Sequence, residues 1–420
     1  MPVRASEPVP LPSPPGFELL IRLPAGVSAG AGRLLLSAYG LQPLELLEPI
    51  GVWRARPVAG SAVSVQSVSN SLNGVALWVE ENGTVYAQET VPNDPYYATY
   101  QWNLPLIELP WAWDLSQGNG QIIAVIDSGI YLEHPDLRDK LWSNLAEVPG
   151  NLIDDDANGY VDDIVGWDFV SGDALPEDGY GHGTHVSGIA GAATGNLIGI
   201  AGVAGGSRLM VLRALGNDGK GTYANIALAI RYAADRGARV INLSLGGTTP
   251  SAALEEQVLY AQSLGCLVVA AGGNTGSVGV LYPAAIGGVL AVSATNSLDQ
   301  AYSGNSRGPE LDVAAPGVTI YSTTRNGLYG LMTGTSMATP HVSGVAALLQ
   351  SYRPDLTWQQ VAETITSTAV DIDVAGWDER TGWGRVDAAA ALASVYRPPR
   401  PYRLMLPLVY YPPCIDCPIW

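Results

Sequence analysis

The sequence has few cysteines, few lysines and no long apolar run. Its 420 residues include 3 cysteines, too few for a disulfide-rich scaffold. No uninterrupted apolar stretch approaches the roughly 18 residues that would predict a membrane-spanning helix. With 21 basic and 39 acidic residues, the net charge is −18 and the pI is near 4.5. A chain without a basic surface is a poor match for the phosphates of nucleic acids or of anionic membranes, so neither is expected as a partner.

The three cysteines predict no metal site. Cys266 lies in an apolar run and is expected to be a buried, inert thiol. Cys414 and Cys417 form a C-x-x-C pair, but no second Cys or His pair is near enough in sequence to complete a zinc site. We expect these two to form a surface disulfide. The first residues lack the apolar segment of a signal peptide, so either the chain stays in the cytosol or a signal has been removed.

Composition and periodicity divide the chain into four parts. Residues 1–15 hold six prolines and predict an extended leader. Residues 16–89 predict a small α+β domain, residues 90–395 the main domain, and residues 396–420 a Pro- and Tyr-rich tail. The small domain is expected to contain a helix at Gly32–Gly40 and strands at Phe17–Leu23, Gly51–Ala55 and Val75–Val79.

Strands and helices are predicted to alternate in the main domain. The expected buried strands are Ile122–Ile126, Leu209–Leu212, Val240–Leu245, Leu267–Ala271 and Val289–Ser293. The expected helices are His185–Ala193, Thr222–Arg236, Ser251–Leu264, Ser336–Ser351, Thr357–Ser367 and Val386–Ser394. Short apolar strands separated by helices of this length predict an α/β fold, a three-layer, doubly wound and mostly parallel sheet.

Four segments of the main domain carry chemistry. Ile122–Gly129 is a buried strand that ends in the carboxylate of Asp127. Gly181–Gly188 places His182 in a Gly-rich turn before a helix, and Gly334–His341 places Ser336 at the start of another. Leu267–Asn274 is a strand that runs through glycines to the side-chain amide of Asn274.

These residue types are the parts of a nucleophilic site. Ligand sites in open α/β sheets form at the carboxyl ends of strands, where Asp127 is expected to lie. A serine hydroxyl needs a neighbouring base, and the base needs an orienting group, so Ser336, His182 and Asp127 make a complete set. The amide of Asn274 and the backbone N–H of Ser336 are candidate donors to a developing oxyanion.

The four segments, in this order, resemble the signature blocks of the subtilisin family of serine endopeptidases, and their details favour its thermitase-like branch. The similarity runs from about Pro92 to Leu392. It implies that Asp127 orients His182, that His182 is the general base, that Ser336 attacks, and that Asn274 helps bind the oxyanion. It also implies polypeptide substrates, a monomer and a secreted enzyme.

Alternative interpretations exist for single residues. Asp127 alone could be a turn residue and Ser336 alone a helix N-cap, but the ordered set argues against both. His134, His185 and His341 are expected to be structural. A metal site formed by His182 and His185 is excluded because their spacing differs from that of a helical H-E-x-x-H pair.

The resemblance also implies how substrate is held. The segment Ser244, Leu245 and Gly246 resembles the edge that pairs with an extended substrate. Ala271, Gly272 and Gly273 would form a wall of the primary specificity pocket, and Leu281 would stand at its base, unless its side chain points away. We therefore expect broad specificity with an apolar preference.

An acidic run in the main domain predicts bound calcium. Nine acidic residues lie between Asp154 and Asp178, with no basic residue among them. The oxygen groups that alternate along its densest part are Asp154, Asp156, Asn158, the Tyr160 carbonyl and Asp162. They resemble the start of a calcium loop, although Val165 stands where an EF-hand has its final Glu. A solvated acidic loop is the alternative, but the mutual repulsion of the charges favours a cation.

Two further calcium sites come from the family resemblance. Its tight site is matched by Asp94, Asp136 and Asn196, with carbonyls of Ala193, Ile198 and Ile200. A third, weaker site would use Asp168, Asp173 and Glu177. Calcium bound only to the native state would raise stability by mass action.

Residues 16–89 resemble the family's propeptide in pattern only. The resemblance implies an intramolecular inhibitor that is removed by self-cleavage, which we expect between Tyr86 and Thr90. Two rivals remain: a catalytically silent binding module with the same fold, and the related carboxyl-type peptidases. The latter have a Glu base and an Asp at the oxyanion position, where this chain has His182 and Asn274.

Overall fold

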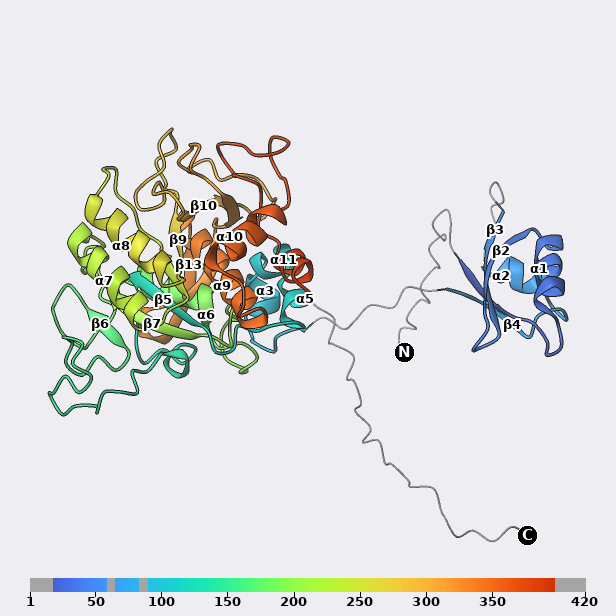
Figure 1. Cartoon of the computed structure of the whole chain (residues 1–420), viewed down its shortest axis with the longest axis horizontal. Coiled ribbons are helices and arrows are strands. Elements are labelled where there is room, and N and C mark those ends of the chain that lie inside the picture. Colours follow the sequence, from blue (N-terminus) through green and yellow to red (C-terminus); the bar gives the residue numbers. More distant parts are fainter. Residues whose placement is uncertain (1–17, 59–64, 83–89, 397–420) are drawn as a thin grey trace, which may run out of the picture. The chain divides into compact units, whose positions relative to one another are not determined.

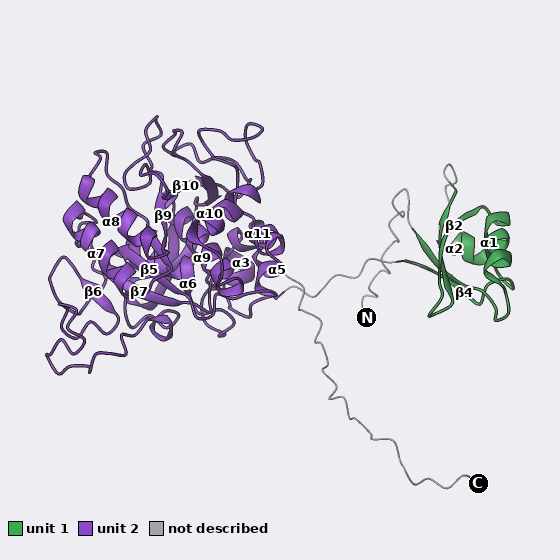
Figure 2. Ribbon diagram, viewed as in Figure 1, with its two compact units in different colours: residues 1–88 green, residues 89–420 purple. Residues whose placement is uncertain are grey.

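The computed structural model describes residues 18–58, 65–82 and 90–396. The chain divides into two compact units, residues 1–88 and 89–420 (Figure 2). The predicted leader, the segment expected to be cleaved and the C-terminal pair Cys414 and Cys417 lie outside the described residues. None of the helices in the described part of the chain has the length and apolar character needed to span a bilayer.

The first unit is a four-stranded antiparallel sheet with strand order β2-β3-β1-β4. Its elements are β1 (Leu19–Arg22), α1 (Ala29–Ala38), β2 (Leu41–Leu47), β3 (Val52–Pro57), α2 (Val65–Ser71) and β4 (Trp78–Glu81). Leu19 and Ile21 are fully buried while their neighbours on the strand are half-buried, as the two-residue period of a strand requires. Counterparts of β1, α1 and β3 were predicted from the sequence, and the predicted strand Val75–Val79 overlaps the start of β4, whereas β2 and α2 were not predicted.

The second unit contains a seven-stranded parallel sheet in the order β11-β10-β9-β8-β5-β7-β6. Its strands are β5 (Ile122–Asp127), β6 (Gly166–Asp168), β7 (Arg208–Arg213), β8 (Val240–Leu243), β9 (Leu267–Ala271), β10 (Leu290–Thr295) and β11 (Val313–Pro316). An antiparallel hairpin of β12 (Ile320–Thr324) and β13 (Leu328–Met332) follows. The predicted parallel sheet is confirmed. Strands β6 and β11 and the hairpin were not predicted from the sequence.

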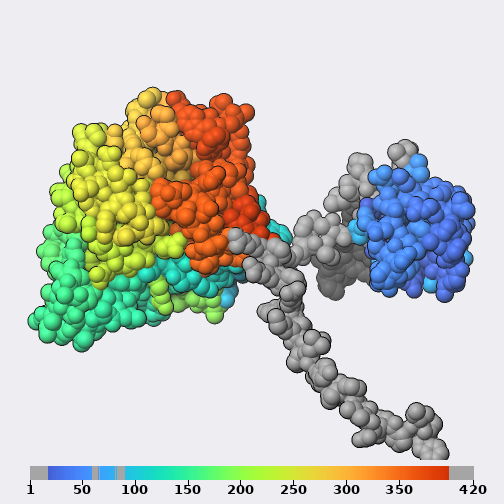
Figure 3. All heavy atoms as spheres, viewed as in Figure 1, coloured from blue at the N-terminus to red at the C-terminus, as the bar shows by residue number. Residues whose placement is uncertain are grey.

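Helices cover both faces of this sheet (Figure 1). They are α3 (Tyr97–Tyr100), α4 (Asn103–Leu106), α5 (Leu109–Trp113), α6 (His182–Gly191), α7 (Tyr223–Asp235), α8 (Ala252–Ser263), α9 (Thr335–Tyr352), α10 (Trp358–Ser367) and α11 (Ala388–Ser394), with short 3-10 turns at Arg138–Lys140 and Arg325–Gly327. The side chains of β5 alternate between two cores. Ile123 and Val125 pack with α6 and α9, whereas Ala124 and Ile126 pack with α7 and α8. Residues of the C-terminal part of the second unit, orange to red, form a large part of the side shown in Figure 3, although α9 itself is mostly buried.

The helix starts follow the capping residues in the sequence. Thr222 and Ser251 accept hydrogen bonds from the third residue of α7 and α8, and Thr357 forms a capping box with Gln360 at α10. Gly237, after α7, has φ of +80° and ends that helix. The neighbouring strands β5, β8 and β9 end at the same edge of the sheet, which places their following residues together.

Candidate active site

Asp127 and His182 form a direct pair. The carboxylate of Asp127, fully buried at the end of β5, lies with its two oxygens 2.8 and 3.0 Å from His182 Nδ1. The backbone N–H of Ser128 also donates to this carboxylate, at 2.7 Å. Gly183 lets the start of α6 approach this closely, because a Cβ there would lie 2.2 Å from the carbonyl oxygen of Gly129. His182 is thereby held at Nδ1 and keeps Nε2 for proton transfer.

The charge on Asp127 changes the acidity of His182. Burial opposes a charged imidazole, but the carboxylate of Asp127, through its charge and its hydrogen bond, outweighs burial. The charge of Asp178 acts in the same direction. Together they raise the pKa of His182 above its ordinary value. The site therefore favours the imidazolium that a histidine becomes when it removes a proton.

Ser336 lies in the first turn of α9 and contacts the segment that follows β8. Its hydroxyl donates to the carbonyl of Ser244 at 3.0 Å, and the hydroxyl of Ser244 donates to the carbonyl of Ser336 at 2.9 Å. Among the described residues, the hydrogen bond of the Ser336 hydroxyl is thus made to Ser244. Hydrogen bonds between a nucleophile and its base are often long or absent without substrate, so this geometry is compatible with attack by Ser336.

Asn274 follows β9 and reaches the start of α9. Its amide oxygen accepts hydrogen bonds from the backbone N–H of Thr335 at 2.9 Å and from the Thr335 hydroxyl at 3.3 Å. Because the oxygen faces Thr335, the amide nitrogen is left to donate elsewhere. Asn274 and the N-terminus of α9 thus lie side by side, as two donors to one oxyanion would need to.

Two cavities flank the segment after β8. The larger, of about 510 Å³, is lined by His182, Ser244, Leu245 and Gly246 together with Tyr223 and other residues. The smaller, of about 300 Å³, shares Leu245 and Gly246 and is lined on its other sides by Ala271, Gly273, Asn274, Thr275, Leu281, Thr335 and Ser336. A chain lying along Leu245–Gly246 would pass both cavities. The structure therefore brings the predicted substrate residues to the predicted nucleophile.

Leu281 points into the smaller cavity. A Cβ on Gly273 would lie 2.6 Å from Leu281 Cγ, and one on Gly246 would lie 2.8 Å from Leu281 Cβ. The leucine side chain therefore fills the space between these two glycines. Gly272 does not line the cavity; a Cβ there would meet the buried side chain of Leu311 at 2.7 Å. Gly272 is needed for packing behind the wall, which differs from the expectation that it forms the wall.

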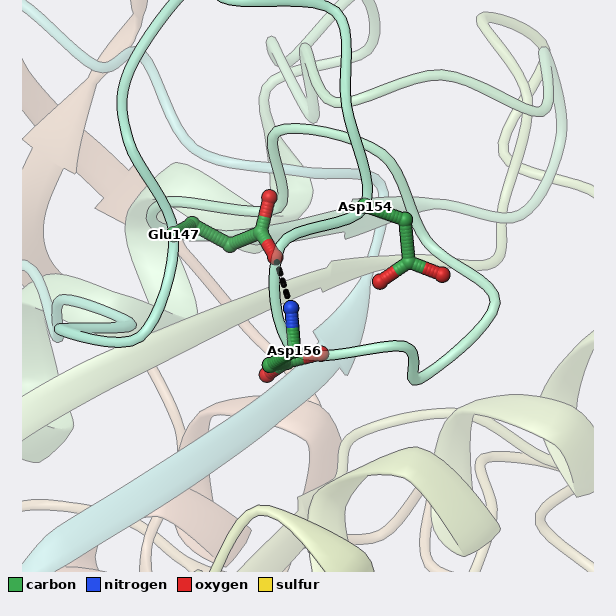
Figure 4. Close-up of side chains that lie close together, drawn as sticks. All are labelled: Glu147, Asp154 and Asp156. Carbon is green, nitrogen blue, oxygen red and sulfur yellow. Dashed lines mark hydrogen bonds between the residues drawn. The ribbon is translucent and has the colours of Figure 1, made fainter.

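The acidic run brings three carboxylates together. Oxygen atoms of Glu147, Asp154 and Asp156 lie within 4.8 Å of one another (Figure 4). Glu147 is 5% exposed and accepts hydrogen bonds from the N–H groups of Asp156 and Asp162. Glu147 was not predicted as a ligand, because this residue precedes the acidic run and lies outside its alternating pattern.

The other residues of this loop that were expected to bind calcium make different hydrogen bonds. The side chain of Asn158 and the N–H of Tyr160 are joined at 2.7 Å within the same turn. The carboxylate of Asp162 instead accepts from the N–H groups of Gly150 and Leu152 at 2.8 and 3.0 Å. Asp162 thus supports the loop from the other side, contrary to its expected place as a ligand.

The expected tight site has the features of a cation site. Asp94 and Asp136 are buried, and one oxygen of Asp94 has no hydrogen-bond partner among the described residues. Asn196 donates to Asp136 at 2.9 Å, and the N–H of Ile200 donates to the other oxygen of Asp136. Burial raises the pKa of both carboxyl groups, and the charge of Asp136 adds to the effect at Asp94. Calcium fits this donor set because it prefers oxygen ligands and would balance the two charges.

The expected third calcium site, formed by Asp168, Asp173 and Glu177, differs from the tight site. Asp168 is 1% exposed and forms an ion pair with Arg213, its partner across the β6–β7 ladder. Asp173 is exposed and accepts from the N–H of Leu175, and Glu177 accepts from the N–H of Leu132. The guanidinium of Arg213 supplies the positive charge next to Asp168. Asp168 is therefore already paired, and these residues make a poorer set of calcium ligands than the tight site, so the third site stays a prediction.

The other histidines have structural contacts. His185 donates through Nε2 to the carbonyls of Ile320 and Gly330 on the hairpin, and His341 bonds Asn103 and the Met337 carbonyl. Burial lowers the pKa of each to about 4, so both are neutral near pH 7.

Known proteins are similar to most of this chain. A model described as "Subtilase family" matches residues 118–384. Thermitase of Thermoactinomyces vulgaris is 42% identical over 303 residues, covering 72% of this chain and 99% of thermitase. A thermophilic serine proteinase of Bacillus sp. (strain AK1) is 44% identical over 291 residues, covering 69% and 67%. Among solved structures, a protease of Pseudoalteromonas arctica PAMC 21717 is similar with a TM-score of 0.63 and 30% identity, covering 73% of this chain and 99% of that one.

Proposed function

Because the chain belongs to the subtilase family and is a serine endopeptidase, we propose that Asp127, His182 and Ser336 are its catalytic triad. The observation that carries this assignment is the pair of short contacts between Asp127 and His182 Nδ1. This pair leaves His182 Nε2 as the base, and Ser336 lies on the neighbouring helix start beside Asn274.

The chemistry is acyl transfer in two halves. His182 takes the proton of the Ser336 hydroxyl as its oxygen attacks the substrate carbonyl. The resulting oxyanion is held by the side-chain amide of Asn274 and the backbone N–H of Ser336. His182 then gives its proton to the leaving amine, which breaks the peptide bond and leaves an ester on Ser336. Water, deprotonated by His182, attacks that ester and releases the acid.

Substrate is proposed to bind as an added strand along Ser244, Leu245 and Gly246. Its side chain before the scissile bond would enter the smaller cavity, between Ala271–Gly273 and Leu281. This cavity is lined largely by apolar and small residues. It supports broad specificity with a preference for apolar side chains of moderate size.

We propose that calcium stabilises the enzyme at two places. One ion would be held by Asp94, Asp136 and Asn196, with carbonyls of the adjoining segment, including those of Ala193, Ile198 and Ile200. A second would be held by Glu147, Asp154 and Asp156, with Asn158 and the Tyr160 carbonyl in the same turn. The buried unpartnered oxygen of Asp94 and the convergence of three carboxylates support these assignments. Calcium there would contribute charge balance and native-state stability.

We further propose that the first unit is an inhibitory propeptide and that the enzyme is secreted as a zymogen. The separate compactness of residues 1–88 supports a removable domain. Cleavage between Tyr86 and Thr90 would free a chain that begins just before Asp94. The new N-terminal segment would then be held by the calcium site.

The intact mass of the purified chain with calcium tests this proposal, with Ser336→Ala beside the wild type. Loss of about the first 85 to 90 residues in the wild type alone is expected, because self-cleavage needs the nucleophile. A folded wild type that stays full length and cleaves no peptide would contradict the proposed triad and favour a silent binding module. A wild type that cleaves peptides but stays full length would contradict the zymogen proposal alone.

A further inference from the structure

Asp178 is a buried carboxylate next to the proposed triad, and it has no role in the mechanism described above. It is 3% exposed and precedes α6 by four residues. One of its oxygens accepts from the Ser128 hydroxyl at 2.9 Å and from the N–H groups of Tyr180 and Gly181 at 2.9 and 2.7 Å. The other accepts from the N–H and the hydroxyl of Thr184. Both oxygens are therefore fully engaged.

Four of the five donor groups flank His182 in the chain, and the fifth belongs to Ser128. Tyr180 and Gly181 precede His182, and Thr184 follows it. Ser128 is the residue after Asp127, and its hydroxyl also accepts the N–H of Gly183 at 2.9 Å. The N–H of Asp178 itself donates to the carbonyl of Ile130. One carboxylate thus joins the backbone on both sides of His182 to the segment that follows β5.

We propose that Asp178 is a positioning residue of this peptidase, which fixes the His182 turn against the end of β5 and keeps a second negative charge beside the imidazole. The inference rests on the proposed role of His182 as the general base. Asp178 does not touch the reacting atoms. It acts through the position of His182 and through the field of a charge that solvent screens poorly at this depth.

The charge of Asp178 has a defined effect on His182. Burial disfavours the imidazolium, Asp127 favours it most strongly of the neighbouring charges, and Asp178 adds to Asp127, so that the pKa of His182 is raised. Removing the charge of Asp178 while Asp127 remains is expected to lower that pKa. The general base would then stay unprotonated to a lower pH, and the imidazolium formed during attack would be less stable.

The other charged groups near this turn have different partners. Arg325 donates to the carbonyl of Gly179, and Arg213 is paired with Asp168. Glu177 is bonded to the N–H of Leu132. His185, also on α6, is neutral near pH 7, and Lys220 is one of the residues that line the larger cavity. Asp178 is therefore the buried charged residue that belongs to the turn before His182.

A simple helix cap is the competing interpretation. The residue at the N-cap of α6 is Gly181, which has no side chain, and Asp178 accepts the N–H of Thr184, the third residue of the helix. A cap affects stability by about 1 kcal/mol. It predicts a lower melting temperature for a variant, with unchanged kinetics for each active molecule. Kinetics therefore separate the two interpretations.

The test compares wild type with Asp178→Asn, each expressed as the full chain with calcium and freed of its first unit, using a short chromogenic peptide. Active-site titration normalises kcat, and kcat/KM is measured from pH 5 to 9. We expect kcat per active site to fall about 10- to 100-fold with KM changed less than about threefold. We expect the acid limb of the kcat/KM profile to move to lower pH by about 0.5 to 1 unit. Glu133→Gln, which removes an exposed charge nearby, is the matched control.

Ser128→Ala separates position from charge. It removes one donor to Asp178 and the acceptor of the Gly183 N–H, but it keeps the carboxylate. It should lower kcat without moving the acid limb, and it serves the test if Asp178→Asn does not fold. An Asp178→Asn enzyme with wild-type kcat and an unmoved acid limb would overturn the proposal. So would a wild-type kcat in Ser128→Ala. A wild type that neither cleaves the peptide nor reacts with the titrant would refute the proposed function instead.

Discussion

The side-chain oxygen of Asn274 accepts the backbone N–H of Thr335 at 2.9 Å, one residue before Ser336. This bond fixes the amide with its nitrogen turned away from Thr335. It also joins the end of β9 to the start of α9, so the two proposed oxyanion donors are held in a constant relation. Donors that are already oriented need no rearrangement as charge develops on the substrate, which is the condition for large electrostatic catalysis.

Replacing Asn274 by Ala should therefore reduce kcat by about 10²- to 10³-fold with little change in KM, because the lost bond forms mainly in the transition state. Steady-state kinetics on a peptide substrate measure this. Asn274→Asp is the matched variant, since it keeps an acceptor for Thr335 but removes the donor. If Asn274→Asp retained more than about a tenth of the wild-type kcat near pH 8, the side chain would not be an oxyanion donor.

The parallel sheet was predictable because its strands are apolar on both faces. Ile122–Asp127 and Leu267–Ala271 read as continuous buried runs, and their ends were found to within one residue. The three-residue strand β6 and the short helices α3 to α5 were not predicted, because segments this short show no periodic pattern of apolar residues. The hairpin β12–β13 was missed because its strands are mixed in burial and polarity.

Candidate site residues could be proposed from the sequence only where a residue type in a distinctive segment points to one chemistry. Asp127, His182, Asn274 and Ser336 could be named because each follows a distinctive segment. Arg213 could not be anticipated as the partner of Asp168, because the pairing depends on strand register between β6 and β7. The same holds for Glu147, which joins Asp154 only through the path of an irregular loop.

Leu281→Gly should widen the choice of side chain before the scissile bond. The leucine fills the space between Gly246 and Gly273, so its removal leaves room for a ring. The ratio of kcat/KM for a peptide with Phe there to one with Ala should rise about 10-fold or more, since added apolar contact in such a pocket is worth about 1–3 kcal/mol. Leu264→Ala, at an exposed leucine on the surface, is the control. An unchanged ratio would mean that Leu281 does not limit the pocket.

Removal of calcium should lower the melting temperature of the Ser336→Ala protein, in which self-digestion cannot confuse the result. At a free calcium concentration 100-fold above Kd, one site contributes about 2.7 kcal/mol. Asp94→Asn should abolish part of the difference between chelator and calcium, because it removes a charge from the two-carboxylate site. Glu147→Gln should abolish another part. If both variants kept the whole wild-type difference, neither group of residues would bind calcium.

Asp312 gives stability a pH dependence of its own. Burial raises its pKa to about 6, although the Ala291 N–H donates to its carboxylate. The pKa of this carboxyl group is higher in the folded protein than its value of about 3.9 in the unfolded chain, so its protonated form stabilises the fold. That contribution is complete below about pH 3.9 and is lost as the pH rises through 6. Asp312→Asn keeps an acceptor without the charge. In the Ser336→Ala background it should match its parent near pH 4 and exceed it by about 1 to 2 kcal/mol above pH 7.

Urea unfolding at several pH values measures this difference. Glu310→Gln, an exposed carboxyl two residues earlier, is the control for loss of a surface charge. A difference in the free energy of unfolding between Asp312→Asn and its parent that stays constant from pH 4 to 8 would contradict this prediction. A difference that grows as pH falls would do so as well.

The order of strands in the parallel sheet has a consequence for synthesis of the chain. β5 pairs with β8, so Ile123 meets Val240 across more than a hundred intervening residues. Sheets closed by such distant pairings fold slowly, whereas the antiparallel β2–β3 pair of the first unit is local. Asp127 and His182 emerge early, but Ser336 enters with α9, which packs against β8, β9 and β10. Ser336 thus follows all seven strands of the parallel sheet in the chain, so we expect proteolytic activity to appear only after that sheet has been synthesised.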